Sequence, residues 1–280
     1  MKYKIVMDSC GELPEEQKND PHFELVPLEL QVGDYRTWDD ESFDQADFLR
    51  RVAESETVAK SACPSPERYM RAYDTPEETE IYVVTLSAPL SGSYNSAELA
   101  KSMYLEDHPD KKIHVFNSCS ASCGETQIAF QIRDMAEAGA SFDEIVEKVG
   151  RFRDEMTTYF VLDDLDPLRK NGRLTGLKSL VASTLSIKPI LSSTPIGEIR
   201  QLGQAVGIKK SLAKMVSFIQ KEKPDADKRP AMITHCNAPE RAELVKQLCE
   251  SVLGCKVVLI QNMAGVSTLY AAAGGIIVTI

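Results

Sequence analysis

The 280-residue sequence has no apolar run long enough to cross a membrane. Its longest nearly uncharged apolar stretch, residues 271–280, is about half of the ~20 residues that a membrane-spanning helix needs, and the two glycines in it suit a core strand better. The chain reaches Asp8 before any long apolar region, so the pattern of a secretory signal peptide is missing. We therefore expect a cytoplasmic protein without stable membrane insertion.

Positive charge is scarce. Lysine and arginine total 32 against 42 aspartates and glutamates, which gives a formal net charge of −10. A negative field of this size disfavours nucleic acid and anionic membrane surfaces as partners. It still leaves room for one local basic patch.

Cysteine pairs that could hold a metal are missing as well. The seven cysteines contain no CxxC motif, and the one close pair, Cys119 and Cys123, lacks the second pair that a zinc site needs. We expect reduced, mostly buried thiols, with no metal and no cofactor. Three nearby aspartates, Asp163, Asp164 and Asp166, fit either a metal site or a solvated loop.

The remaining pattern is that of an α/β protein. Hydrophobic residues make up 43% of the chain and charged residues 26%, which is typical of globular proteins, and the length predicts about two domains. Short apolar runs alternate with longer amphipathic ones, as in βα units around a largely parallel sheet. The composition changes near residue 160. We predict an N-terminal α/β domain, residues 1–160, with a largely parallel sheet and flanking helices, and a smaller C-terminal α/β domain, residues 161–280.

Local signals also place several element ends. Ser141 and Glu144 form a capping box that predicts a helix start. Asn237, with Glu240 three residues later, predicts another. The turn residues 195–197 predict a hairpin.

Three hydroxyl-rich turns, residues 60–66, 87–96 and 117–122, are the clearest candidates for a binding site. The second and third follow predicted strands, and turns at strand ends converge on the ligand crevice of an open α/β sheet. In the second turn Gly92 would let the backbone approach an anion, and Ser91 and Ser93 would add donors. The alternative is that these serines only cap a helix. A nucleotide is disfavoured because neither GxxxxGK[ST] nor GxGxxG occurs.

A serine nucleophile is a second possibility, and it requires a base within hydrogen-bond reach. Of the four histidines, only His235 lies at the end of a predicted strand, and the G-x-S-x-G elbow is missing. His235 therefore fits a structural role better than a catalytic one. Asp8 is interpreted as a turn or cap residue. The basic group Arg169, Lys170 and Arg173 is either a solvated surface or a site for an acidic partner.

Taken together, these segments resemble the DegV family of bacterial fatty-acid-binding proteins. The matching pieces occur in the family's order and span most of the chain. They are Asp8-Ser9 with Leu13-Pro14, Val26-Pro27-Leu28, the turn 61–66, the segment 90–97, the segment 165–173 and Ile187-Lys188-Pro189-Ile190.

The resemblance implies a non-enzymatic carrier that holds a long-chain fatty acid in an apolar tunnel between two α/β domains. Ser61 and Ser91 stand where the family binds the carboxylate, with Gly92 and Ser93 assisting. Some relatives are subunits that present the acid to a separate fatty acid kinase. A serine-dependent hydrolase or acyl-transfer enzyme is the alternative, and a module whose basic loop, Arg169 to Arg173, docks an acidic partner is a second one.

The sequence departs from the family in two places. Many relatives carry a His-x-Gly-Pro-Gly element near the carboxylate, which is absent here. Either Ser267, Thr268 or Tyr270 substitutes for it, or the head group is held differently. The basic element before the helix at residue 209 has no arginine, because Val206-Gly207-Ile208 occupy it. The resemblance ties that region to the kinase contact, so this departure bears on kinase partnership more than on lipid binding.

Overall fold

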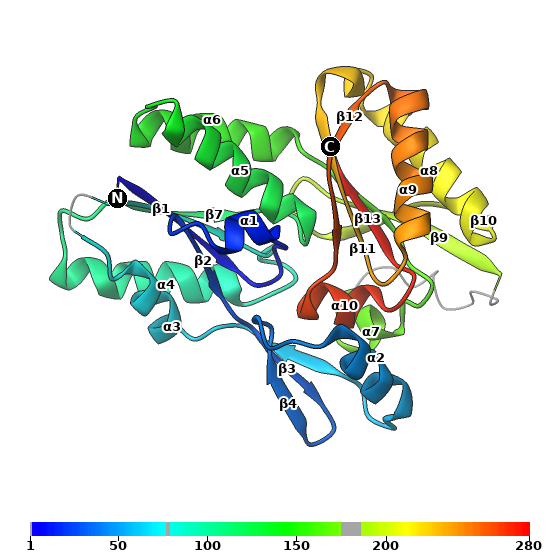
Figure 1. Ribbon diagram of the computed structural model, residues 1–280, viewed down its shortest axis with the longest axis horizontal. Coiled ribbons are helices and arrows are strands. Elements are labelled where there is room, and N and C mark those ends of the chain that lie inside the picture. Colours follow the sequence, from blue (N-terminus) through cyan, green and yellow to red (C-terminus); the bar gives the residue numbers. More distant parts are fainter. Residues whose placement is uncertain (1, 77–78, 175–185) are drawn as a thin grey trace.

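A parallel sheet with helices on both faces forms the first half of the computed structural model, which describes residues 2–76, 79–174 and 186–280 (Figure 1). Its strands run in the order β2-β1-β6-β7, and every neighbouring pair is parallel. The expected largely parallel sheet is therefore confirmed. The elements of this half are β1 (Tyr3–Asp8), α1 (Glu15–Lys18), β2 (Phe23–Val26), α3 (Pro66–Tyr73), β6 (Glu80–Thr85), α4 (Ser93–Asp107), β7 (Ile113–Asn117), α5 (Cys123–Glu137) and α6 (Phe142–Glu155).

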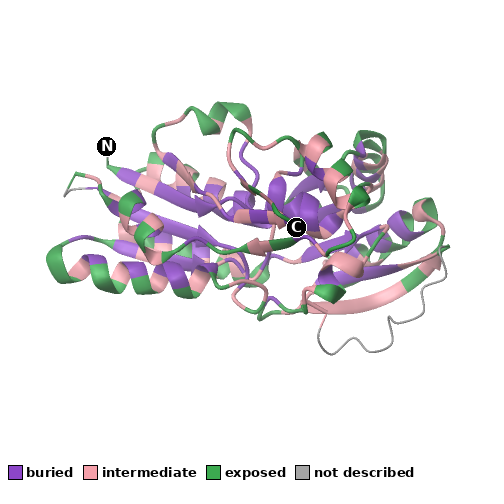
Figure 2. Cartoon of the chain, turned by 90° about the horizontal axis from the view of Figure 1, so that it is seen from below, coloured by how far each residue is buried: buried purple, intermediate pink, exposed green. Residues whose placement is uncertain are grey.

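Alternating burial explains the layers of this half. On β6, Ile81 and Val83 join the cluster formed with α3 and α4, whereas Tyr82 and Val84 join the cluster formed with α5 and α6. Successive side chains of a strand point to opposite faces, so a strand buried on both faces must be apolar throughout. Figure 2 shows these strands buried along most of their length.

The second half contains a mixed sheet of six strands in the order β10-β9-β8-β13-β11-β12. Only β11 and β12 pair in parallel, and the predicted hairpin through residues 195–197 joins the antiparallel strands β9 and β10. The elements are β8 (Thr158–Val161), β9 (Ile187–Ser193), β10 (Ile199–Val206), α8 (Ile208–Glu222), η2 (Ala226–Lys228), β11 (Pro230–His235), α9 (Pro239–Leu248), the π-helical turn η3 (Cys249–Leu253), β12 (Lys256–Asn262) and β13 (Ile276–Thr279).

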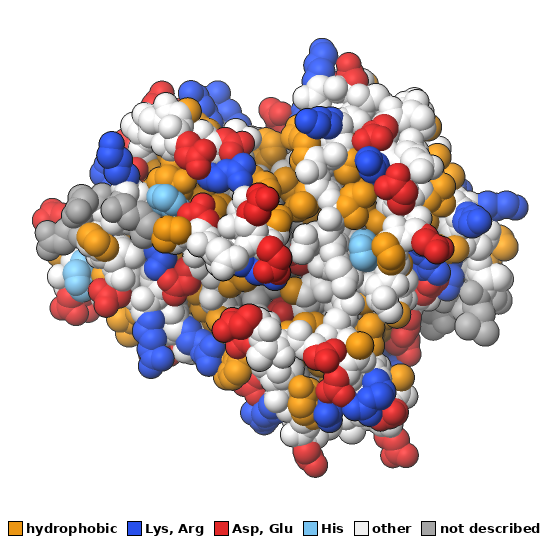
Figure 3. Space-filling view, in the orientation of Figure 1, with side chains coloured by type: hydrophobic (Ala, Val, Ile, Leu, Met, Phe, Trp, Pro, Cys, Tyr) orange, Lys and Arg blue, Asp and Glu red, His pale blue; other side chains and the backbone are white. Residues whose placement is uncertain are grey.

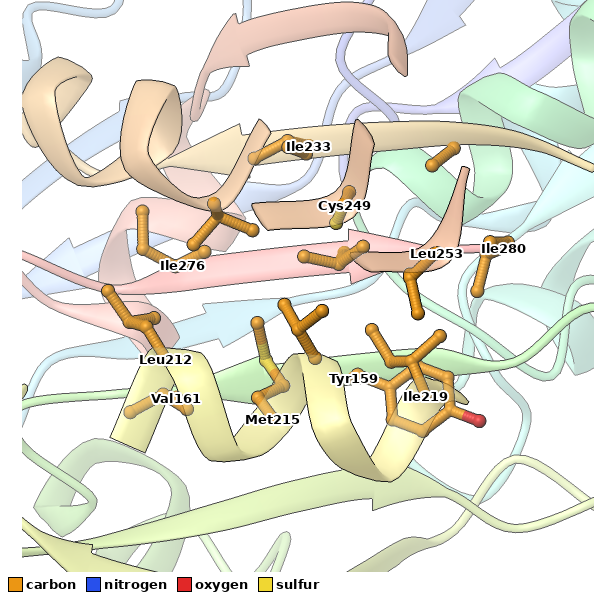
Figure 4. Close-up of a cluster of buried hydrophobic side chains, with 14 of the residues drawn as sticks. Tyr159, Val161, Leu212, Met215, Ile219, Ile233, Cys249, Leu253, Ile276 and Ile280 are labelled. Carbon is orange, nitrogen blue, oxygen red and sulfur yellow. The ribbon is translucent and has the colours of Figure 1, made fainter. Parts of the chain in front are cut away.

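One face of this sheet packs against α8, α9 and η3 (Figure 4). Leu212, Met215 and Ile219 project from α8 at helical spacing onto the sheet, where they meet β8 and β13. Strand β8 crosses the residue at which the domain boundary was expected, and it pairs inside the second sheet.

A small three-stranded sheet extends below both halves in Figure 1. Its order is β4-β3-β5, and both pairs are antiparallel. Ser61 lies on the short strand β5 rather than in a turn, so this part of the turn prediction was wrong. The elements here are β3 (Glu29–Val32), β4 (Tyr35–Trp38), α2 (Gln45–Glu54), β5 (Lys60–Ala62), α7 (Asp166–Lys170) and α10 (Gly265–Ala271).

The two predicted helix starts had different outcomes. The Ser141–Glu144 capping box is present at α6. The prediction of an Asn237 cap was wrong, because Ala238 is the N-cap of α9 and no side chain caps that helix. Asn237 adopts a left-handed conformation with φ of 47°, and its backbone N–H donates to Asn262.

Within the described residues, no helix combines the length and apolar character needed to cross a membrane. Acidic and basic side chains are interspersed over the face in Figure 3. All seven cysteines are free thiols, of which five are buried, as expected; Cys63 is exposed and Cys119 is half-buried.

Candidate ligand-binding site

An apolar hollow lies between the two halves. It encloses about 730 Å³ of empty space when the open solvent at its mouth is counted. Its lining surface is almost entirely carbon. Both halves and α10 contribute apolar side chains to it, among them Leu86, Leu90, Phe160, Leu162, Val266 and Ile277.

A second, more polar compartment adjoins this hollow. Ser61 and Cys63 line it, together with Ser91 and Gly92 from the turn before α4. The two spaces share five lining residues, so one opens beside the other. The shared residues are Leu86, Leu90, Arg173, Val266 and Tyr270.

Ser61 and Tyr270, which both line the polar compartment, are joined by a hydrogen bond. The Ser61 Oγ and Tyr270 Oη atoms are 3.0 Å apart. Strand β5 carries Ser61 and α10 carries Tyr270, so the pair joins segments that are 209 residues apart in sequence. Of the three expected substitutes for the missing histidine, Tyr270 is the one that meets Ser61.

The other two substitutes have different surroundings. Ser267 lines the apolar hollow, and its hydroxyl donates to the Cys10 carbonyl at 3.3 Å. Thr268 is fully buried and lines neither space; its hydroxyl accepts a hydrogen bond from Gln45 at 2.8 Å and donates to the Met263 carbonyl at 3.3 Å.

The turn before α4 places its serines unequally. Ser91 lines the compartment, whereas Ser93 is fully buried behind it. The Ser91 hydroxyl accepts from the Ser93 N–H at 3.1 Å and donates to the Ser93 hydroxyl at 3.2 Å. A Cβ atom at Gly92 would lie 2.9 Å from the sulfur of Cys63, which is at the end of an exposed side chain. Neither serine caps the helix, since Gly92 is the N-cap of α4.

Arg173 lies at the boundary between the two spaces, which differs from the outward basic loop expected from the sequence. Its Nε donates to the Leu90 carbonyl at 3.1 Å, and its guanidinium carbon is 5.6 Å from the centre of the Tyr270 ring. The sequence marked Arg173 only as a member of the basic group with Arg169 and Lys170. Arg169 and Lys170 do face solvent, where both pair with Asp166.

The remaining candidates have structural partners. The His235 Nδ1 atom accepts from the Ala238 N–H at 3.2 Å, and burial lowers the pKa of this histidine. Asp8 is buried, and its carboxylate accepts from the N–H groups of Cys10 and Leu86. Asp163 pairs with Lys188 and Arg241. Across the described ranges, no group of three or more potential ligands is arranged to hold a metal.

The third hydroxyl-rich turn mainly connects the two halves. The Ser120 hydroxyl is 2.5 Å from that of Thr158, and the Ser122 hydroxyl is 2.7 Å from that of Thr234. Ser120 also lines the hollow, whereas the Ser118 hydroxyl donates to the Ser120 carbonyl. That this turn contacts a ligand stays a prediction.

Buried carboxyl groups near the site were not anticipated. Asp8, Glu12, Asp39 and Glu125 are all at most 3% exposed, and none belongs to an ion pair among the described residues. Burial raises the pKa of all four groups, to about 7 for Glu12 and to about 6 for Asp39. Their sequence positions carry no periodic signal that could have identified them.

The family model described as "Uncharacterised protein, DegV family" matches residues 2–279. A DegV domain-containing protein from Streptococcus pneumoniae is 35% identical over 280 residues, which cover 99% of this chain and 98% of the relative. A crystal structure of a DegV family protein from Ruminococcus gnavus, refined with vaccenic acid, is 49% identical and has a TM-score of 0.95, with both chains covered completely.

The Streptococcus pneumoniae fatty acid kinase B3 protein, crystallised with linoleic acid, is 32% identical and has a TM-score of 0.90. That match covers 100% of this chain and 99% of the other. The family match over nearly the full length and the agreement in fold lead to one conclusion: this chain belongs to the DegV family.

Proposed function

We propose that this protein binds a long-chain fatty acid, with its carboxylate in the polar compartment and its acyl chain in the apolar hollow. The observation that carries the proposal is the junction of the two spaces through their shared lining residues. An amphiphile with one polar end fits such a junction. Each CH₂ group moved from water into the hollow contributes about 0.8 kcal/mol.

The head-group contacts follow from the donors in the compartment. Ser61 and Ser91 supply hydroxyl groups, and Tyr270 takes the place of the family's histidine. Arg173 adds a positive charge at the boundary. Gly92 lines the same compartment and assists there, whereas the buried Ser93 assists through its hydrogen bonds with Ser91.

The wider role that we propose is that of a non-catalytic carrier in fatty acid metabolism. Relatives with vaccenic and linoleic acids support it, and one of them is named as a fatty acid kinase B protein. We extend the proposal to presentation of the acid to a separate kinase. Mixing the loaded protein with a fatty acid kinase catalytic subunit and ATP should yield an acyl phosphate, and an unchanged acid would refute this extension alone.

Mass spectrometry of small molecules released from the purified protein tests the main proposal. We expect a near-stoichiometric long-chain fatty acid. A protein that neither carries nor takes up such an acid would refute fatty-acid binding. Labelling of Ser91 by a fluorophosphonate probe would instead favour the serine-enzyme alternative.

A double variant then tests the residues. Ser61→Ala with Ser91→Ala removes two donors to a charged group and should weaken affinity at least about tenfold. Ser102→Ala is the matched control, since this exposed hydroxyl bonds only to the Glu98 carbonyl on α4. Equal affinities for the double variant and the control would show that the head group binds elsewhere.

A further inference from the structure

Asp39 connects α10 to the first half of the molecule. This residue follows β4 and is 2% exposed. One carboxylate oxygen accepts from the Gly265 N–H at 2.6 Å; the other accepts from the Val266 N–H at 2.9 Å and from the Ser9 hydroxyl at 3.0 Å. Two of the three bonds therefore hold the start of α10, and the third holds the segment that follows β1.

The contact depends on a close approach at Gly265. A Cβ atom at this position would lie 2.6 Å from an Asp39 carboxylate oxygen and 2.5 Å from a Leu30 methyl group. Leu30 belongs to β3 and pairs directly with Ser61 on β5. The start of α10 is thus pressed against the sheet that carries the head-group serine.

The geometry of the candidate site follows from this contact. Tyr270 lies near the end of the same short helix, with its hydroxyl 3.0 Å from that of Ser61. A shift of α10 away from Asp39 would move Tyr270 relative to Ser61, because both contacts involve one rigid helix and one small sheet.

We propose that Asp39 is a positioning residue for the fatty-acid site, whose carboxylate holds α10 so that Tyr270 and Ser61 can engage the head group together. The proposal rests on the function proposed above. It adds a residue that lines neither the apolar hollow nor the polar compartment and acts through α10.

The charge state of Asp39 gives this role a measurable pH dependence. The ionisable groups that face it are Asp8, at the end of β1, and Glu12, in the segment that follows. Burial, and to a lesser degree the charge of Asp8, raise the pKa of Asp39 to about 6. Protonation relieves the cost of the buried charge, but it places a hydrogen on an oxygen that now accepts a hydrogen bond.

As the pH falls through about 6, the contribution of Asp39 to the stability of the fold and its contribution to fatty-acid affinity should therefore change in opposite directions. A raised pKa in the folded state means that acidification through about pH 6 favours folding at this group. The same acidification removes an acceptor from α10 and weakens the head-group site. A purely structural role would move stability and affinity together.

Asp39→Asn, with Asp40→Asn as the control, tests the proposal. The Asp40 carboxylate accepts only from Ser42 in the same loop. At pH 7.5 the dissociation constant of a fluorescent fatty acid should be about tenfold higher for D39N than for the wild type. Below about pH 6 the ratio of the two dissociation constants should approach one. D40N should match the wild type. An equal affinity of D39N at pH 7.5, or a ratio independent of pH, would overturn the proposal.

Trp38, the one tryptophan in the chain, precedes Asp39 and provides a direct probe. Its emission in the wild type should show an inflection near pH 6 that persists in D40N and disappears in D39N. A wild-type titration without that inflection would contradict the assigned ionisation. If D39N does not fold, Gly265→Ala replaces it, because its added methyl group forces α10 away from the carboxylate.

A crystal structure of D39N without ligand separates this proposal from the proposed function. If the wild type binds no fatty acid, the proposed function is wrong, and the structure still decides the role of Asp39. Tyr270 displaced from Ser61 would support positioning, and an unchanged 3.0 Å contact would refute it.

Discussion

Glu12 is a buried acid whose replacement should stabilise the protein at alkaline pH. It is 3% exposed, one carboxylate oxygen accepts from the Ser122 hydroxyl at 2.8 Å, and the other has no hydrogen-bond partner among the described residues. Burial is the main reason why its pKa rises from 4.5 to about 7, and the charge of Asp39 adds to the effect. Glu12→Gln keeps an oxygen acceptor for Ser122 and removes the charge.

The expected gain follows from the shift in pKa. A rise in the pKa of Glu12 from 4.5 to about 7, at about 1.36 kcal/mol per pKa unit, corresponds to about 3 kcal/mol in the free energy of unfolding. Because the folded-state pKa is raised, the stabilising effect of protonation is complete below pH 4.5 and is lost as the pH rises through about 7. The E12Q variant should therefore match the wild type near pH 4.5 and exceed it by about 3 kcal/mol at pH 8.5.

Urea denaturation at the two pH values measures this difference. Glu16→Gln, an exposed substitution on α1, is the control and should change the free energy of unfolding by less than about 0.5 kcal/mol at either pH. A variant no more stable than the wild type at pH 8.5 would refute the argument. So would a difference of the same size at both pH values, which would indicate a packing effect rather than a charge effect.

Two further substitutions test the contacts between the halves by urea denaturation. Gly197→Ala should lower the free energy of unfolding by more than about 2 kcal/mol, since φ is 84° and a Cβ atom would lie 2.0 Å from the Ser87 hydroxyl. Gly139→Ala is the control: φ is 79° and the space around it is open, so the loss should be about 1 kcal/mol. Equal costs would mean that the hairpin is not tightly docked. Ser120→Ala should cost about 1–2 kcal/mol because it leaves the buried Thr158 hydroxyl without its partner, and an unchanged midpoint would argue against that bond.

Much of the fold could be predicted because its signals are local. The apolar run that forms β7, at Ile113–Asn117, and the capping box at Ser141 both report on backbone geometry within a few residues. The predicted Asn237 cap failed because the side chain of Asn262, on a neighbouring strand, accepts the Asn237 N–H and holds that turn. A contact between segments 25 residues apart overrode the local preference.

The residue types around the candidate site could be predicted, but the directions in which their side chains point could not. Hydroxyl-rich segments favoured an anion site or helix caps, and Ser61 and Ser91 line the polar compartment in which we propose that the carboxylate binds. The pattern gave no sign that Ser122 would bond across to Thr234 instead of facing a ligand. It also gave no sign that Arg173 would turn toward the hollow.

By itself, the sequence determined the longer strands and helices, because a period of two or of 3.6 residues sets which side chains one surface can bury. It also determined that hydroxyls and few bases would be available near the strand ends. Only the tertiary structure decided which hydroxyls meet. Ser61 and Tyr270 are 209 residues apart, and α10, which carries Tyr270, is hydrogen-bonded at its start to Asp39. Burial of four carboxyl groups is likewise a property of the assembled halves, since desolvation depends on the atoms that surround a group and not on its neighbours in sequence.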